Sequence, residues 1–389
     1  MDITIQPRLL RGDVSIIPSK SMAHRLLICA AFADKPTQII CPDINRDIEA
    51  TVDCLNALGA DIRRSDTGYS IQPISENPLT AHLNCCESGS TLRFMLPIVG
   101  ALGVDGIFHM EGRLPQRPLS PLWEEMQRMG CSLSRPTDNT IRCCGKLISG
   151  EYVIAGNVSS QFFTGLLFAT ALMDEKSQIT VTGTLESKPY VDMTKYAMSL
   201  FDAPNFHTPG TIQVEGDWSN GAFWMAAKSL GSRLHVLGLN AESVQGDRAV
   251  MEILPLLHSG CPTVSAADIP DLVPILSIAA AAGNGAVFTD IRRLRLKESD
   301  RVATVISMVE ALGGIARASE NSLTIEGTGL QGGTVHACND HRIAMAAAIG
   351  ATVCAEPVTI LGAECVSKSY PKFWEEYSRL GGNYEQYLR

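Results

Sequence analysis

One pattern recurs along the chain and constrains its fold more than any other feature: a few small polar residues followed by an alanine-rich apolar stretch. The six stretches are SKSMAHRLLICAAFA, ESGSTLRFMLPIVGALG, GNVSSQFFTGLLFATALM, SNGAFWMAAKSLG, IPDLVPILSIAAAAG and CNDHRIAMAAAIGATVC, beginning near residues 19, 87, 156, 219, 269 and 338. None approaches the roughly 20 apolar residues that cross a bilayer, so we expect buried helices. Their spacing suggests one supersecondary unit copied six times.

A second, amphipathic helix follows each buried one, as in ESDRVATVISMVEALGG, where Val302, Val305, Ile306, Val309 and Leu312 share one face. In three units a glycine then leads into paired strands, LGADIRRSDTGYSIQP, MGCSLSRPTDNTIRCCG and LGGIARASENSLTIEG. The unit is therefore predicted to be helix, strand, helix and paired strands. The third and fourth units are too short for the full strand pair.

The length of 389 residues suits two domains. We predict an α/β (α+β) fold with three units in each domain, alanine-rich helices packed inside, sheets outside and a ligand cleft between the domains. The segment VEGDWSNG is the natural return point, because it falls just before the fourth buried helix. The expected domains are 1–18 with 217–389, and 19–216.

Composition narrows the possible partners. A formal net charge of −9 argues against nucleic acid or an anionic membrane, which would repel the chain at long range. The start MDITIQPRLL lacks the pattern of a signal peptide, so a cytoplasmic protein is expected. The twelve cysteines form no C-x-x-C pair, and we expect reduced, buried thiols.

Cations stand at or just before many helix starts, where unpaired backbone N–H groups also favour anions. They are Lys20, Arg25, Arg93, Arg117, Lys188, Lys297, Arg301, Arg342 and Lys368. Each could alone be a solvated charge, but the same placement recurs in unit after unit. The sequence therefore predicts a site for anions.

Several polar residues near these cations have two interpretations. Ser159, Ser160 and Gln161 suit phosphate oxygens, although serines also cap helices. Asp271 could cap a helix and Glu298 could pair with a neighbouring cation, yet a carboxylate among cations is also what proton transfer requires. The stretch GTGLQG, residues 327–332, matches G-x-G-x-x-G but does not lead directly into a helix, so we interpret it as a turn.

These segments together resemble the 5-enolpyruvylshikimate-3-phosphate synthase family over nearly the whole chain and in the family's order. The ten matching motifs are PSKSMAHR, ESGSTLRF, QRPLSPL, GNVSSQF, SKPYVDMT, SVQGDR, IPDLVP, RLKESDR, NDHRIAMAAA and SKSYP. A match to one such motif is weak evidence for the family, but matches to ten motifs in the family's order are specific evidence. The resemblance implies a two-domain transferase of the shikimate pathway and aromatic amino-acid biosynthesis, a monomer and a target of glyphosate.

The resemblance also implies site residues. Shikimate 3-phosphate is expected at Lys20, Ser21, Arg25, Ser159, Ser160, Gln161, Ser187, Asp271 and Lys297. Phosphoenolpyruvate is expected at Lys20, Gly89, Arg117, Gln161, Arg301, Arg342 and Lys368. Asp271, Glu298 and Lys20 are the expected catalytic residues, and neither a metal nor an organic cofactor is expected. The sequence leaves open how the three divide the proton transfers.

The chain departs from the family at a few positions. Arg293 stands where many members have asparagine, so that contact is not carried over; Ser90 replaces a frequent threonine, and Glu87 an asparagine. A sibling family adds enolpyruvyl to a UDP-sugar, and many of its members have a cysteine where this chain has Gly112. A non-catalytic binding relative is the other alternative, suggested by the two shortened units.

Overall fold

The computed structural model describes residues 1–43 and 45–387. The chain divides into two compact units, Met1–Ile17 with Gly216–Arg389, and Pro18–Glu215. They are called here the 216–389 unit, which includes residues 1–17, and the 18–215 unit. Each expected domain limit lies one residue from these bounds.

The 18–215 unit alternates helices with short strands. In chain order it contains α1 (Lys20–Ala31), β3 (Thr37–Ile40), α2 (Arg46–Ala57), β4 (Asp61–Ser65), β5 (Gly68–Gln72), β6 (Thr80–Asn84), α3 (Gly89–Leu102), β7 (Asp105–His109), η1 (Leu114–Gln116), α4 (Leu122–Arg128), β8 (Cys131–Thr137), β9 (Thr140–Gly145), β10 (Glu151–Ala155), α5 (Ser160–Ala171), β11 (Gln178–Thr182), α6 (Lys188–Leu200) and β12 (Thr211–Gln213).

The 216–389 unit begins with two strands from the N-terminus and continues after the other unit. It contains β1 (Asp2–Gln6), β2 (Arg11–Ser15), α7 (Trp218–Ser229), β13 (Arg233–Leu237), η2 (Gly246–Ala249), α8 (Val250–Ser259), β14 (Thr263–Ser265), α9 (Val273–Ala282), β15 (Ala286–Thr289), η3 (Arg292–Leu296), α10 (Arg301–Ala311), β16 (Ile315–Ala318), β17 (Ser322–Glu326), β18 (Gly333–His336), α11 (His341–Ala351), β19 (Val358–Leu361), η4 (Ala363–Lys368), α12 (Phe373–Arg379) and β20 (Asn383–Tyr387).

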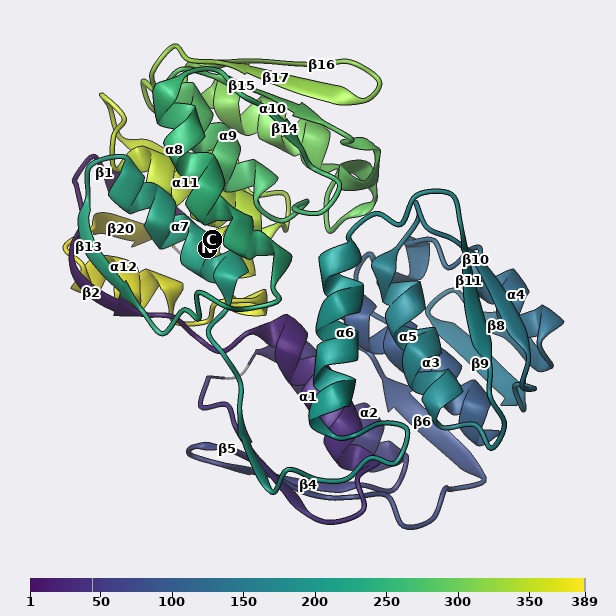
Figure 1. Cartoon of the computed structure of the whole chain (residues 1–389). Coiled ribbons are helices and arrows are strands. Elements are labelled where there is room, and N and C mark those ends of the chain that lie inside the picture. Colours follow the sequence, from purple (N-terminus) through teal and green to yellow (C-terminus); the bar gives the residue numbers. More distant parts are fainter. Residues whose placement is uncertain (44, 388–389) are drawn as a thin grey trace. The chain divides into compact units, whose positions relative to one another are not determined.

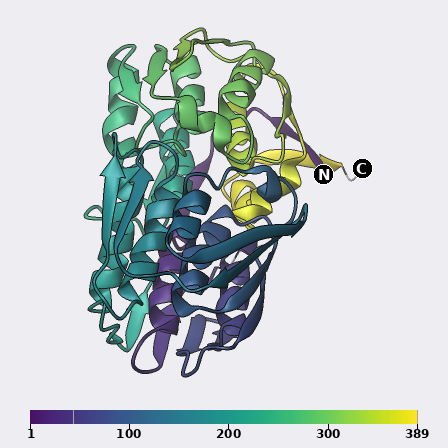
Figure 2. The ribbon, with the colours of Figure 1, turned by 90° about the vertical axis from the view of Figure 1, so that its right-hand side faces the viewer.

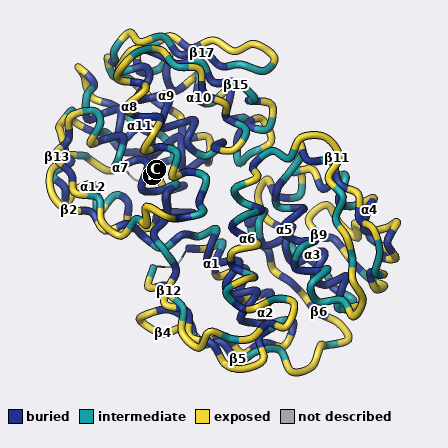
Figure 3. The backbone as a smooth tube through the Cα atoms, in the orientation of Figure 1, coloured by how far each residue is buried: buried dark blue, intermediate teal, exposed yellow. Residues whose placement is uncertain are grey.

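The six alanine-rich stretches form α1, α3, α5, α7, α9 and α11, as predicted. Every residue of α11 is buried, and in both units the helices lie inside while strands cover the outside (Figure 1). The burial colours show the alanine-rich inner helices mostly buried, whereas buried and exposed residues alternate along many of the outer strands (Figure 3). The predicted α/β (α+β) organisation is confirmed.

Four sheets share one strand pattern. Residues 1–43 and 45–387 form four four-stranded sheets and two two-stranded sheets. In β14-β15-β17-β16 the first pair is parallel and the next two are antiparallel. The sheets β6-β7-β9-β8, β12-β3-β5-β4 and β18-β19-β1-β20 repeat this order. In the last of them β1 pairs with β20, which brings the two ends of the chain together (Figure 2).

The two short sheets belong to the third and fourth units. Each consists of a single parallel pair, β10 with β11 and β2 with β13. The antiparallel pair that completes the other sheets is absent from both within the described residues. The predicted shortening is confirmed, and one valine on each strand of the β10-β11 pair, Val153 and Val181, is 38–40% exposed.

Small residues let the inner helices pack closely. Helix α5 lies against α3, and a Cβ on Gly165 would collide with the carbonyl oxygen of Arg93 and come within 3.0 Å of Pro97. Glycine is therefore required at this crossing. The close packing fixes the two helix starts, Gly89 and Ser160, relative to each other.

Candidate functional site

Asp271 is the centre of a charged cluster in the 216–389 unit. Serine or aspartate side chains cap the other five inner helices, α1, α3, α5, α7 and α11. Helix α9 has Leu272 at its N-cap and no side-chain cap bond. The carboxylate of Asp271 instead accepts from Arg301 Nη1 at 2.5 Å and Arg342 Nη2 at 2.9 Å. The capping interpretation of Asp271 is therefore wrong.

Arg301 is fully buried and joined to three carboxylates. Besides Asp271, its Nη2 donates to Glu298 Oε2 at 2.7 Å and its Nε to Asp340 Oδ2 at 2.9 Å. Asp340 also accepts from the Ser299 hydroxyl at 3.0 Å. A guanidinium with these partners has one fixed orientation, so Arg301 holds Asp271 and Glu298 in place. The expected ion pair of Glu298 is thus present.

The cluster controls the protonation of its members. Burial alone would raise the pKa of Asp271, but Arg342, Lys297 and Arg301 lower it well below its usual range. Burial lowers the pKa of Lys297, whose Nζ lies 3.4 Å from Asp271 Oδ1. An anion that engages Arg342 or Lys297 would offset their charge and raise the pKa of Asp271. Anion binding would therefore make this carboxylate a better base.

Asp247 is a buried carboxyl near this cluster that the sequence did not single out. It lies on η2; its Oδ2 accepts from the Ser219 hydroxyl, and its Oδ1 has no hydrogen-bond partner among the described residues. Burial, followed by the charge of Asp271, raises its pKa to about 7, although Arg342 opposes the shift. The motif SVQGDR contained this residue, but its protonation depends on burial that a motif does not reveal.

Arg342 and Lys368 lie at the start of α11. Arg342 is the second residue of this helix and is 5% exposed. Lys368 ends η4, and its Nζ lies 3.4 Å from the carbonyl oxygen of Asn339, which precedes the helix cap. Both predicted phosphoenolpyruvate ligands therefore adjoin the positive end of one helix.

Lys20 begins a second group of candidate residues, in the 18–215 unit. It is the first residue of α1, and its Nζ lies 2.8 Å from Asp47 Oδ2. Sequence reasoning missed Asp47, which lies in the first turn of α2. No motif around it indicates that it pairs with Lys20. One turn further along α1, His24 Nδ1 lies 2.7 Å from Thr51 Oγ1. Burial lowers the pKa of His24 to about 3, so its ring is neutral.

Arg25 ties α1 to α6. Its Nε donates to Thr194 Oγ1 and its Nη2 to the Tyr190 carbonyl, both at 2.9 Å, and its Nη1 donates to the Ser21 carbonyl at 2.5 Å. Burial lowers its pKa only to about 10, so it stays charged at neutral pH. These partners are neutral, and a buried cation held by neutral oxygens favours an anionic ligand.

Gln161 connects the starts of α3 and α5. Its Oε1 accepts from Arg93 Nη1 at 2.7 Å, and its Nε2 donates to Ser90 Oγ at 2.9 Å. The cation Arg117 lies beside them: a Cβ on Gly89 would be 3.0 Å from Arg117 Cζ and closer still to Nη1. Gly89, Gln161 and Arg117 are thus close together, as the resemblance implies.

The predicted serines have different local roles. Ser159 caps α5 by accepting from Gln161 N at 3.3 Å, so its capping interpretation is confirmed. Ser160 is buried as the first residue of α5. Ser187 is buried with a left-handed backbone, φ 55°, and makes no cap bond to α6. A left-handed serine costs free energy and is often found at ligand sites.

Comparisons with known proteins cover nearly the whole chain. The profile of the EPSP synthase (3-phosphoshikimate 1-carboxyvinyltransferase) family matches residues 5–259 and 258–377. A 3-phosphoshikimate 1-carboxyvinyltransferase of Clostridium kluyveri is 36% identical over 420 residues, covering 99% of this chain and 98% of that protein. That of Clostridium acetobutylicum is 37% identical over 421 residues, with the same coverage.

Solved structures share the fold. An EPSP synthase from Acinetobacter baumannii matches with a TM-score of 0.80 at 22% identity, covering 99% of this chain and 100% of that one. The enolpyruvyl transferase NikO from Streptomyces tendae matches with a TM-score of 0.73 at 16% identity, covering 99% and 98%. With the full-length profile match and the clostridial relatives, these findings establish that the chain belongs to the EPSP synthase family.

Proposed function

We propose that the chain is a 3-phosphoshikimate 1-carboxyvinyltransferase. It transfers the enolpyruvyl group of phosphoenolpyruvate to the 5-hydroxyl of shikimate 3-phosphate and releases phosphate, in the shikimate pathway of aromatic amino-acid biosynthesis. Membership of the EPSP synthase family supports the reaction and its substrates. The observation that carries the residue assignment is the carboxylate of Asp271 held by Arg301, Arg342 and Lys297.

The substrates are anions, and the proposed ligands are mostly cations and hydroxyls. Shikimate 3-phosphate is assigned to Lys20, Ser21, Arg25, Ser159, Ser160, Gln161, Ser187, Asp271 and Lys297. Phosphoenolpyruvate is assigned to Lys20, Gly89, Arg117, Gln161, Arg301, Arg342 and Lys368. The neutral partners of Arg25 support its assignment to the phosphate. Guanidinium groups suit both substrates because they bind carboxylate and phosphate by two parallel hydrogen bonds.

The reaction is an addition followed by an elimination. The 5-hydroxyl oxygen bonds to C2 of phosphoenolpyruvate, its proton passes to Asp271, and C3 gains a proton. The tetrahedral adduct then loses phosphate from C2 and a proton from C3. Glu298 and Lys20 exchange the proton at C3 and assist the departing phosphate. Substrate anions beside Arg342 and Lys297 raise the basicity of Asp271 only when the site is filled.

The sibling activity on a UDP-sugar is disfavoured by the local structure around Gly112. This residue has φ 56°, and a Cβ there would lie 2.6 Å from Glu87 Cδ. A cysteine there would be strained by the left-handed backbone, and the end of the Glu87 side chain would have to move away from it. The loop therefore disfavours the cysteine that many sibling enzymes carry.

The proposed enzyme is a cytoplasmic monomer. Its net charge of −9 disfavours association with nucleic acid or anionic membranes. No helix in residues 1–43 and 45–387 has the length and hydrophobicity to span a bilayer. Light scattering after size-exclusion chromatography would test the monomer, and a mass twice that of the chain would contradict it.

A phosphate-release assay tests the function. The chain is incubated with phosphoenolpyruvate and shikimate 3-phosphate, with phosphoenolpyruvate and UDP-N-acetylglucosamine, or with phosphoenolpyruvate alone. Release only in the first mixture is expected. Release only in the second would indicate the sibling activity, and release in none would indicate a binding protein. Asp271→Asn is the matched inactive control.

A further inference from the structure

Two buried threonines hold the guanidinium group of Arg25 from neighbouring helices. Thr194 lies in the middle of α6 and Thr164 in the middle of α5, and both are fully buried. Arg25 Nε donates to Thr194 Oγ1 at 2.9 Å, and Arg25 Nη2 donates to Thr164 Oγ1 at 3.3 Å. The two threonine oxygens are 2.8 Å apart. Arg25 is therefore fixed to a hydrogen-bonded pair that joins α5 with α6.

The hydroxyl protons of this pair have one consistent arrangement. An arginine N–H can only donate, so both threonine oxygens act as acceptors toward Arg25. The Thr194 hydroxyl donates to the Tyr190 carbonyl at 3.0 Å. Thr164 then donates to Thr194, because the Thr194 proton is already used. Both oxygens thus orient the cation, and neither neutralises its charge as a carboxylate would.

Protein atoms occupy nearly all the donors of Arg25. A guanidinium carries five N–H groups. Nε donates to Thr194, and Nη2 donates to both Thr164 and the Tyr190 carbonyl. Nη1 donates to the Ser21 carbonyl, and its second N–H has no acceptor among the described residues. This remaining donor shares its nitrogen with the bond to Ser21, another residue assigned to shikimate 3-phosphate.

An aromatic ring covers one face of the same guanidinium. Arg25 Cζ lies 5.2 Å from the centre of the Phe94 ring, which belongs to α3. This distance is within the range of a cation–π contact. The ring opposes movement out of the guanidinium plane, and the threonine hydroxyls oppose rotation within it. The positive charge is thus held in one place by neutral partners.

We propose that Thr194 and Thr164 are positioning residues for the binding of shikimate 3-phosphate, an inference that rests on the proposed function. They act through Arg25 by aiming its remaining N–H and its positive charge at an anionic group of this substrate. A group that is oriented before binding loses less conformational freedom when the ligand arrives. Phosphoenolpyruvate is not assigned to Arg25, so the threonines should affect the binding of only one substrate.

Steady-state kinetics of Thr194→Val test the proposal. Valine keeps the branched shape of threonine but lacks the hydroxyl, so the Arg25 Nε–H loses its acceptor. The KM for shikimate 3-phosphate should rise about tenfold. Both kcat and the KM for phosphoenolpyruvate should stay within about twofold of the parent values, because the lost interaction concerns binding of the other substrate. Thr194→Ser keeps the hydroxyl and should restore the parent KM.

Nuclear magnetic resonance follows the geometry without turnover. The buried Nε–H of Arg25 should give a 1H–15N signal that exchanges slowly with water, identified by its absence in Arg25→Lys. The signal should exchange fast in Thr194→Val and slowly in Thr194→Ser. Slow exchange in Thr194→Val would show that the hydroxyl does not hold the guanidinium, and would overturn the proposal.

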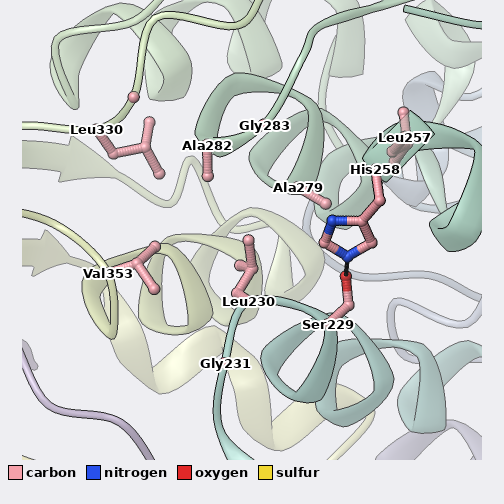
Figure 4. A pocket seen from close by; sticks show the side chains of 11 residues that line it. Ser229, Leu230, Gly231, Leu257, His258, Ala279, Ala282, Gly283, Leu330 and Val353 are labelled. Atoms are coloured by element: carbon pink, nitrogen blue, oxygen red, sulfur yellow. Dashed lines mark hydrogen bonds between the residues drawn. The ribbon is translucent and has the colours of Figure 1, made fainter. Parts of the chain in front are cut away.

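Thr352→Val is the matched control. Thr352 is buried, and its Oγ1 donates to the Ile349 carbonyl at 2.7 Å. It precedes Val353 on the wall of a cavity whose lining includes none of the residues assigned to the substrates (Figure 4). This variant should lose thermal stability but keep the parent KM values. If Thr194→Val does not fold, Thr164→Val makes the same test with a smaller rise in KM, since its bond to the guanidinium is longer.

The outcomes separate this inference from the proposed function. A parent chain that does not turn over shikimate 3-phosphate with phosphoenolpyruvate would refute the proposed function and the inference with it. Normal turnover of the parent, with an unchanged KM for shikimate 3-phosphate in Thr194→Val, would refute the positioning role alone. Equal rises in both KM values, or a raised KM that serine does not restore, would indicate a general structural role and would also overturn the proposal.

Discussion

Replacing Gly89 by alanine tests the assignment of the phosphoenolpyruvate site most directly. The added Cβ would lie 3.0 Å from Arg117 Cζ and from Arg93 Nη1, and closer still to Arg117 Nη1. Carbon atoms in contact prefer about 3.5–4.0 Å, so the Arg117 guanidinium must withdraw by roughly 0.5–1 Å. A displacement of that size at a binding group can cost about 10²-fold in catalytic efficiency.

The loss should be functional rather than structural. The atoms that must move are the end of a flexible side chain, and alanine is favoured over glycine in a helix by about 1 kcal/mol. Gly89→Ala should therefore melt at or above the temperature of the parent chain. Its KM for phosphoenolpyruvate should rise, with kcat/KM falling about 10–100-fold.

Glyphosate gives this prediction a second measurement. Glyphosate carries a phosphonate and a carboxylate at either end of a short chain, and it should inhibit the parent protein competitively with phosphoenolpyruvate when shikimate 3-phosphate is present. Gly89→Ala should weaken this inhibition more than it weakens phosphoenolpyruvate binding, because phosphoenolpyruvate is slightly smaller. Gly260→Ala is the control, since its Cβ meets nothing within 4 Å. Unchanged inhibition and unchanged KM in Gly89→Ala would refute the placement of Arg117 at the site.

Three further outcomes are expected. Lys20→Met and Arg342→Ala should each fold normally but lose about 10–150-fold in kcat/KM, because each removes a charge-assisted contact worth about 1.5–3 kcal/mol; near-normal turnover in both would refute the site. The pKa of Asp247 is raised to about 7, so this group lowers the unfolding free energy as pH rises from about 4 to about 7. Asp247→Asn should therefore gain stability relative to the parent between pH 5 and pH 8 in urea unfolding, and an equal difference at both pH values would contradict this. The pKa of His24 is lowered to about 3, so below about pH 6.5 the unfolded chain protonates this ring while the folded chain does not, and the free energy of unfolding falls. His24→Gln should therefore lose less stability than the parent between pH 7 and pH 4.5. A parallel loss in the two proteins would argue against a buried neutral ring.

The sequence by itself determined the repeated units and their shortening. A few neighbouring residues encode each of the local features: the alanine-rich helices, their serine and aspartate caps, and the turns of the paired strands. The segment ESDRVATVISMVEALGG shows this, because the helix predicted from its apolar face formed as α10, and Asp300 caps it. The order of ten motifs also determined the family, since each motif is short and contiguous.

Tertiary structure alone decided which charges meet. Asp271 and Arg342 are 71 residues apart and are joined only because α9 packs against α11. The pairing of Lys20 with Asp47 across 27 residues is of the same kind. Local sequence left Asp271 open between a helix cap and a proton-transfer carboxylate and gave no role to Asp47, because the energy of an ion pair depends on distance and burial rather than on neighbours in the chain.

The protonation of the buried carboxyls was likewise beyond the sequence. Asp247 and Asp271 are the same residue type near the same arginine, yet the pKa of Asp247 is raised to about 7 while that of Asp271 falls well below its usual range. Burial would raise the pKa of both, but Asp271 has Arg301 and Lys297 in addition to Arg342. Two aspartates acquire opposite pKa shifts because the fold gives them different numbers of cationic partners.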